Sequence, residues 1–124
     1  MRKTESLSTT TITTAGTGTT SVPSGARFAV CELQGAGGGA SYDGEPLNTL
    51  QGSGGNGGKA EATLIVSSGE SLNYGCGGGG GTGGFGITGS AGLVGGGAPG
   101  SANVGGGGGF TYLKRGSDML LAAG

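Results

Sequence analysis

The chain has 124 residues, of which 36 are glycine, and its six basic and seven acidic side chains leave a net charge of −1. This near-neutral balance excludes the clustered basic patch on which electrostatic nucleic-acid binding depends. The absence of histidine excludes Ser-His-Asp and Cys-His catalysis, and with them every zinc site that is built on imidazole.

Residues 1–20 form a threonine-rich region that predicts an N-terminal strand, with the strongest β propensity over 9–14 and a turn at 15–16. The basic residues Arg2 and Lys3 are not followed by the apolar core of a signal peptide. No apolar run reaches the length of a transmembrane helix. We therefore expect neither signal-directed export nor membrane insertion.

Residues 26–33 are predicted to form a strand, and because both of its faces are fairly apolar we expect it to be central in a sheet. Residues 59–66 alternate most regularly, with Ala and Leu on the face that is predicted to meet the core. A turn over 67–70 leads into 72–76, and we expect 59–66 and 72–76 to form a hairpin.

The C-terminal segment is predicted to contain strands over 110–114 and 118–123, joined by a turn at 115–117. No segment has a helical period, so we expect no α-helix. The aromatic residues that fall in predicted strands are assigned to the core: Phe28, Tyr74, Phe110 and Tyr112.

Two glycine tracts, 35–58 and 77–109, interrupt the predicted strands. From Gly77 to Gly95 glycine recurs at every third position, which is the period of the polyproline-II helix, and the lack of proline in this run argues against collagen. An edge without side chains lets a neighbouring backbone approach and form hydrogen bonds. At about 3.1 Å per residue the run would be too long for a small domain, so we expect it to fold back, with the bend at 88–90.

The same composition is found in disordered glycine-rich linkers, but the strand-like segments that frame the glycine tracts argue for an ordered fold. Cys31 and Cys76 lie in predicted strands, and we favour buried free thiols over a disulfide, which would need neighbouring strands and an oxidising compartment. Asp43 and Glu45 are too few for calcium, which takes six or more oxygen ligands. No motif fits a nucleotide, so we expect neither a metal nor a cofactor.

The order of several short motifs resembles the glycine-rich domain family of bacteriophage tail-fibre proteins, which is related to the glycine-rich domain of anaplastic lymphoma kinase-type receptors. The resemblance extends over 13–124. The motifs that carry it are Val22-Pro23-x-Gly25, Gly35-Ala36-Gly37-Gly38-Gly39, Gly57-Gly58-Lys59-Ala60, Ser68-Gly69-Glu70, the glycine run 105–109 and Leu121-Ala122-Ala123-Gly124. Relatives usually carry another glycine tract after the last motif, so we expect the chain either to stop short or to be part of a larger assembly.

The length predicts one domain over 1–124. The resemblance implies that it is a small antiparallel β-sandwich with an interleaved bundle of polyglycine-II helices. It also implies recognition through loops at the ends of those helices, which match 41–51, the region of Thr88 and 98–104. The candidate receptor-binding residues in these loops are Tyr42, Asp43, Glu45, Leu47, Asn48, Thr88, Ser90, Pro99 and Asn103.

We therefore expect a non-enzymatic virion or tail-fibre protein, made in the host cytoplasm, that binds a bacterial surface receptor (protein or glycan) beside other virion proteins. The alternative is a structural virion or fibre component that acts as a spacer or assembly surface. An ice-binding glycine bundle is a third and weaker interpretation, because Phe85, Ile87 and Leu93 interrupt the regular face of small residues that it would require.

Overall fold

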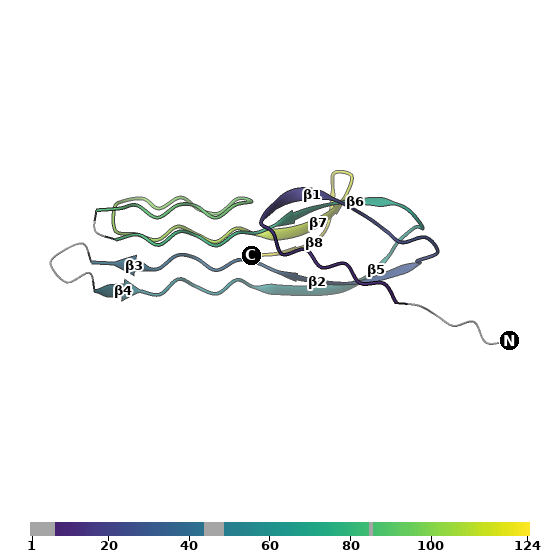
Figure 1. Ribbon diagram of the computed structural model, residues 1–124, viewed down its shortest axis with the longest axis horizontal. Helices are drawn as coiled ribbons and strands as arrows, with labels where there is room; N and C mark the ends of the chain where they lie inside the picture. The colour runs from purple at the N-terminus through teal and green to yellow at the C-terminus, as the bar shows by residue number, and fades with distance from the viewer. Residues whose placement is uncertain (1–6, 44–48, 85) are drawn as a thin grey trace.

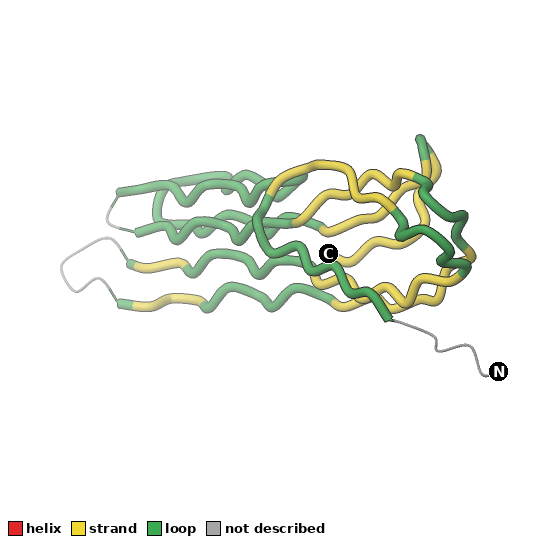
Figure 2. The backbone as a smooth tube through the Cα atoms, turned by 45° about the vertical axis from the view of Figure 1, so that its right-hand side comes forward, coloured by secondary structure: helices red, strands yellow, loops and turns green. Residues whose placement is uncertain are grey.

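The computed structural model describes residues 7–43, 49–84 and 86–124. The molecule is elongated: most of its strands gather at one end, and the glycine tracts extend from them toward the other (Figures 1 and 2). The described residues contain eight strands and no helix, and every pair of these strands is antiparallel. The prediction of a mainly β fold without α-helix is therefore confirmed over this part of the chain.

The eight strands form three sheets (Figure 1). The four-stranded sheet has the order β1 (Gly16–Ser21), β6 (Ser71–Cys76), β7 (Thr111–Arg115) and β8 (Asp118–Ala123). The two smaller sheets pair β2 (Phe28–Gln34) with β5 (Lys59–Ile65), and β3 (Ser41–Tyr42) with β4 (Leu50–Gly52).

The predicted hairpin between 59–66 and 72–76 is wrong. β5 pairs with β2, whereas β6 lies between β1 and β7 in the other sheet. The turn over 67–70 carries the chain from one sheet to the other. Alternation shows which face of a strand is buried but does not identify its partner strand, so two strands that follow one another need not pair.

The core lies between the four-stranded sheet and the β2–β5 sheet, because both supply side chains to one cluster. The predicted inward face of β5 is confirmed, since Ala60 and Leu64 pack against this cluster while Lys59 and Glu61 are exposed. The six buried hydrophobic residues of the cluster are Val22, Leu33, Val66, Leu72, Leu113 and Ala123.

β2 is not a central strand, and this corrects two predictions. It pairs only with β5 in the described part of the chain, and its face that carries Phe28 and Val30 is not covered by the other sheet. Phe28, assigned to the core from the sequence, is 67% exposed. Tyr74 packs against the core as expected. Phe110 and Tyr112 are half-buried, with ring centroids 5.4 Å apart.

The N-terminal strand lies later in the chain than its threonine content predicts. Residues 9–14 are irregular, and β1 begins at Gly16, where a turn was expected. The Tyr74 ring explains why glycine is needed in β1, because a Cβ atom on Gly18 would lie 2.6 Å from the Tyr74 hydroxyl oxygen.

The predicted C-terminal hairpin is confirmed as β7 and β8, in which Arg115 lies opposite Asp118. Gly116 and Ser117 form its two-residue loop, and Gly116 has φ +59°. A positive φ at the first loop position is the requirement of a type II′ turn, which glycine meets without strain.

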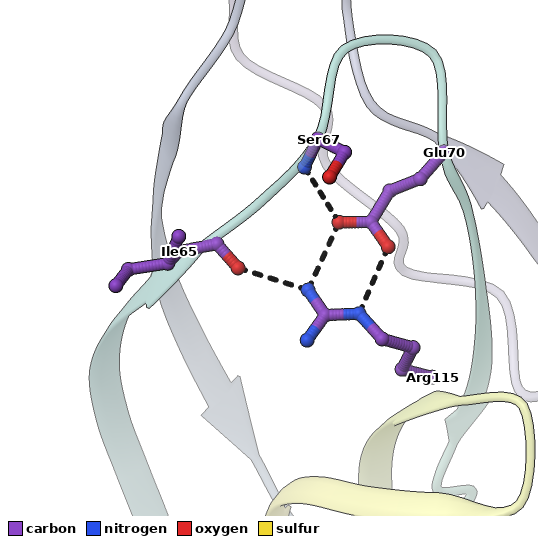
Figure 3. A network of polar contacts seen from close by, with 4 residues as sticks. All are labelled: Ile65, Ser67, Glu70 and Arg115. Carbon is purple, nitrogen blue, oxygen red and sulfur yellow. Dashed lines mark hydrogen bonds and ion pairs between the residues drawn. The ribbon is translucent and has the colours of Figure 1, made fainter.

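A polar network joins the β5–β6 connection to the β7–β8 hairpin (Figure 3). The Arg115 guanidinium donates two hydrogen bonds of 2.9 Å to the Glu70 carboxylate and a third, also of 2.9 Å, to the Ile65 carbonyl. The Ser67 backbone N–H donates to Glu70 Oε1 at 2.8 Å. These bonds favour the charged carboxylate, so the pKa of Glu70 is lowered, chiefly by Arg115 and then by the Ser67 N–H.

The lowered pKa of Glu70 predicts a loss of stability in acid. Because the folded state holds the carboxylate more strongly than the unfolded chain does, its contribution is complete above the usual glutamate pKa of 4.5 and is lost as the pH falls through the lowered folded-state pKa. Urea unfolding between pH 6 and pH 3 is expected to show a smaller decrease of the midpoint in Glu70→Gln than in the wild type. Equal decreases in the two proteins would contradict this role of Glu70.

Candidate functional site

The chain from β2 to β5 forms one continuous antiparallel ribbon that runs the length of the molecule (Figure 1). The register of the β2–β5 pair passes through the glycine tracts without a shift, and changes only at the irregularity between Ser41 and Tyr42 in β3. The Gly35 N–H donates to the Gly58 carbonyl at 2.8 Å, and the Gly38 N–H donates to the Gly55 carbonyl at 2.9 Å, so these backbone hydrogen bonds are spaced three residues apart. The pairs that mark this register are Gln34 with Lys59, Gly35 with Gly58, Gly38 with Gly55, and Ser41 with Gly52.

The β6–β7 pair continues into glycine tracts in the same way. Gly75 lies opposite Tyr112, and in the same register Gly109 donates to Gly78 and Gly106 donates to Gly81, both at 2.9 Å. The hydrogen bonds again recur every three residues, whereas the strands alternate every two. The strands therefore change from a two-residue to a three-residue repeat while they keep the same partner.

Further hydrogen bonds join these tracts into a bundle. Tract 77–84 donates to tract 87–94 from Gly78, Gly81 and Gly84, and tract 35–40 accepts from Gly80 and Gly83. Glycine is required where tracts meet. A Cβ atom on Gly39, Gly80, Gly106 or Gly108 would overlap the carbonyl group of a neighbouring tract.

The bend predicted at 88–90 is wrong, because the chain reverses between Gly84 and Ile87. These two residues exchange backbone hydrogen bonds of 2.9 Å in both directions. Gly89 is instead buried inside the next tract and donates to the Val104 carbonyl at 3.0 Å. The threefold period does not reveal the reversal, since glycine stands at the same spacing within tracts and at the positive-φ positions Gly86 and Gly95.

The end of the bundle farthest from the large sheet, which we call the bundle tip, is formed by β3, β4 and the reversal at 84–87 (Figures 1 and 2). The Tyr42 backbone N–H donates to the Gly83 carbonyl at 3.1 Å, and that of Asp43 donates to the Thr49 carbonyl at 2.7 Å. Backbone bonds therefore hold both ends of the loop that joins β3 to β4.

Asn103 fixes a second part of the bundle tip. Its Oδ1 atom accepts from the Gly86 N–H at 2.6 Å, and its own N–H donates to the Ile87 carbonyl at 3.1 Å. Asn103 has φ +69°, a left-handed conformation that asparagine tolerates better than most residues. We infer that Asn103 positions the reversal, so its side chain is committed within the protein.

The structure brings some of the predicted receptor-binding residues together and separates others. Tyr42, Asp43, Thr88 and Asn103 lie at or beside the bundle tip, with Asp43 and Thr88 exposed and Tyr42 half-buried. Ser90 lies three residues after Ile87 in tract 87–94, away from the bundle tip, and its carbonyl accepts from Gly81. Pro99 lies in the segment between Gly97, whose carbonyl accepts from Gly107, and the tip residue Asn103. The remaining predicted residues, Glu45, Leu47 and Asn48, are outside the described residues.

Three exposed apolar residues at the bundle tip were not predicted from the sequence: Ile87 is 63%, Leu50 50% and Val104 38% exposed. Ile87 directly follows the turn glycine Gly86, and Val104 directly follows the capping residue Asn103. An apolar residue next to a turn glycine could have indicated an exposed contact residue, but the sequence did not show which glycine forms the turn.

The described residues contain no group of three or more His, Cys, Asp or Glu that could hold a metal ion. Cys31 and Cys76 are free and half-buried, on strands of different sheets. Burial raises the pKa of the Cys31 thiol, and the Cys76 thiol contacts the Ile12 carbonyl at 3.8 Å. Among the residues described, no helix is long and apolar enough to cross a membrane.

No family model, curated protein or solved structure matches the chain. The function is therefore inferred from the geometry of the bundle tip, its exposed side chains and the hydrogen bonds that hold them.

Proposed function

We propose that the protein is a non-enzymatic binding module of a virion or tail fibre, which contacts a bacterial surface molecule through the bundle tip. The observation that carries this proposal is the pairing of β3 with β4 at the far end of a ribbon whose arms keep one register back to β2 and β5. Loops that a rigid scaffold holds in place are common sites of binding.

The mechanism is rigid presentation. Backbone bonds at three-residue spacing connect the tracts on several sides, and this spacing supports their description as polyglycine-II helices. The ends of the tip loops are thus fixed before a receptor arrives, so docking loses less conformational entropy than it would from a mobile loop.

The described part of the bundle tip combines apolar side chains with few charges. Ile87, Leu50 and Val104 offer apolar contact, Thr88 offers a hydroxyl group, and Asp43 contributes a negative charge. This chemistry suits a protein or glycan receptor better than a nucleic acid or an anionic membrane, both of which favour basic surfaces. The proposal requires neither a metal nor a cofactor.

The alternative, a structural virion or fibre component, is favoured by a different observation. The outer face of the β2–β5 sheet exposes large apolar side chains far from the bundle tip. Exposed apolar patches often mark assembly surfaces. Under this alternative the bundle would act as a spacer, and the tip would bind no receptor.

Adsorption of labelled protein to a panel of bacterial envelopes separates the two functions. We expect binding to a subset of strains, and loss of at least about 90% of that binding when 43–49 is replaced by a glycine-serine loop of equal length and Ile87 and Val104 are replaced by serine, because truncating the dominant contacts of an interface costs several kcal/mol. Ser41, Tyr42 and the β4 residues are left unchanged, so the pairing of β3 with β4 is retained.

The matched control is Ser117→Gly in the β7–β8 turn, at the opposite end of the molecule (Figure 1). It should bind like the wild type. Circular dichroism and thermal unfolding must show that all three proteins are folded. A folded wild-type protein that binds no strain in a broad panel would overturn the receptor-binding proposal and favour the structural alternative.

A further inference from the structure

The three-residue repeat of tract 52–58 gives this arm of the β2–β5 ribbon three separate edges. Gly54 and Gly57 form one edge, which contacts tract 35–40, because a Cβ atom on either glycine would overlap a carbonyl group of that tract. The second edge carries polar side chains and is exposed to solvent. The third edge, which we call the open edge, again consists of glycine: Gly52, Gly55 and Gly58.

A neighbouring backbone contacts the open edge at Gly58. The Gly58 N–H donates to the carbonyl of Gly124, which β8 brings against the tract, and a Cβ atom on Gly58 would lie 2.8 Å from that carbonyl oxygen. One and two repeats closer to the bundle tip, a Cβ atom on Gly55 or Gly52 would meet nothing within 4 Å. Neither glycine has a positive φ. No side-chain contact or backbone conformation among the described residues therefore requires glycine at these two positions.

A groove continues from Gly124 toward the bundle tip along tract 35–40. At the sheet end of this tract, a Cβ atom on Gly35 would lie 2.6 Å from the Gly124 carbonyl carbon, and Gly35 is buried. One repeat farther along, Gly38 is half-buried, and a Cβ atom there would have ordinary contacts of 3.4 Å or more. The groove therefore begins beside the C-terminus, at the junction of the strands and the glycine tracts (Figure 1).

The two walls of the groove present backbone N–H groups, from Gly55 on one side and Gly108 on the other. A Cβ atom on Gly38 would lie 3.7 Å from the first nitrogen and 3.9 Å from the second. In the part of the chain that the structure describes, neither N–H donates a hydrogen bond. Each lies three residues before a residue that is paired with the C-terminal segment, namely Gly58 and Thr111. A backbone on the same path as that segment would meet both donors.

We propose that this groove binds an extended, glycine-rich segment of a second, different polypeptide, which adds one more tract to the bundle. The segment would run in the direction of β8, antiparallel to tracts 52–58 and 105–109, and its carbonyl groups would accept from Gly55 and Gly108. Donors with a three-residue spacing match a backbone with the same repeat, as in the addition of a strand at the edge of a sheet. The described tracts of a second copy are hydrogen-bonded within their own bundle, so we assign the segment to another polypeptide.

The shape of the groove defines the repeat of the segment. Two of its three edges would face the walls and floor of the groove, where a Cβ atom would overlap backbone, and the third would face solvent. We therefore expect a Gly-Gly-x repeat, in which x is a polar residue. Tract 52–58 itself has this pattern, with Ser53 and Asn56 on its solvent-exposed edge.

Titration of the full chain with a peptide of three Gly-Gly-Ser repeats, followed through the NMR amide signals of the nitrogen-15-labelled protein, tests the groove. We expect saturable shifts of the Gly55 and Gly108 signals at millimolar peptide, since a flexible glycine peptide loses much conformational entropy on binding. Hydrogen exchange of the same two amides should become slower, because the peptide carbonyl groups cover them. A control peptide of Gly-Ala-Ser repeats should bind at least about 10-fold more weakly, because its added Cβ atoms would overlap the walls.

Gly55→Ala tests the open edge from the side of the protein. It places a methyl group in the groove and is expected to weaken binding of the Gly-Gly-Ser peptide at least about 10-fold. A Cβ atom on Gly55 meets nothing within 4 Å in the free protein, so this variant should fold, which thermal unfolding checks. Asn56→Ala, on the solvent-exposed edge of the same tract, is the matched control and should bind like the wild type.

Unchanged Gly55 and Gly108 signals at several millimolar peptide would overturn the proposal. Equal binding of the two peptides would also overturn it, because the site would then not select glycine. If Gly55→Ala bound the peptide like the wild type, the contact would lie elsewhere and the groove would not be the site. Shifts of the same signals with protein concentration alone would identify a second copy as the occupant and overturn the assignment to a different polypeptide.

Discussion

Gly106→Ala is expected to destabilise the protein by at least about 3 kcal/mol, or to prevent folding. Gly106 is buried in the bundle, and a Cβ atom there would overlap the carbonyl group of Ser90 and lie 3.0 Å from the Ala91 backbone nitrogen. Backbone atoms cannot move aside as a flexible side chain can, and overpacking of this kind commonly costs about 1–3 kcal/mol or more. Gly106 also donates to Gly81, so a shift of the tract would break that bond.

Gly55→Ala is the matched control, because a Cβ atom on Gly55 would meet nothing within 4 Å and Gly55 does not have a positive φ. Alanine at such a site is expected to be neutral or to stabilise by about 0.4–1 kcal/mol, since it restricts the unfolded chain. Thermal unfolding should show a fall in Tm of more than about 10 °C for Gly106→Ala only. Equal effects of the two substitutions would contradict close packing of the tracts.

Leu72→Ala is expected to cost about 2–5 kcal/mol of unfolding free energy. Leu72 is 3% exposed, the lowest exposed fraction in the hydrophobic cluster, and β6 carries it into the core between β1 and β7. Among the described residues the core contains six buried hydrophobic side chains, so the cavity left by the substitution would remove a large part of the packing. Urea unfolding measures the change.

Ile65→Ala serves as the comparison, because Ile65 is 77% exposed and its substitution should change the unfolding free energy by less than about 0.5 kcal/mol. If Leu72→Ala were as mild as Ile65→Ala, the cluster between the sheets would not be the main source of apolar stabilisation.

The parts of the fold that were predicted correctly depend on residues close together in the sequence. The inward face of β5 follows from the alternation of Ala60 and Leu64 with charged residues. The β7–β8 hairpin follows from a glycine between two apolar segments, and Gly116 does adopt a positive φ. The contact edges of the glycine tracts follow from their spacing, since Gly80 and Gly83 meet neighbouring backbones as expected.

The errors concern partners that are distant in the sequence. Phe28 and Val30 have the composition of a buried face, and nothing local indicates that β2 has one paired strand and that no described element covers this face. The hairpin between 59–66 and 72–76 was inferred from proximity along the chain, yet the β2–β5 and β6–β7 registers each arise from pairing across a glycine tract. Such long-range choices depend on the whole set of packed tracts.

The candidate site shows the same division between features that are local in the sequence and features that depend on distant partners. The 41–51 region was identified as a loop because it lacks a period and lies between glycine tracts, and β3 and β4 do bring its ends together. The role of Asn103 as a cap on Gly86, and the exposure of Ile87, depend on where the chain reverses. Several equivalent glycines could have supported that reversal, so its position was not predictable from spacing.

The unbroken registers have a consequence for how such a protein can change in length during evolution. Inserting one residue into either arm of the β2–β5 ribbon would rotate every later residue of that arm by a third of a turn, replacing contact glycines such as Gly39 with side chains that cannot fit. Only insertions of three residues, made together in all the tracts that touch, would preserve the contacts. Each would lengthen the bundle by about 9 Å. Single insertions and deletions should therefore be confined to the connecting loops, while the glycine tracts grow or shorten only in whole turns.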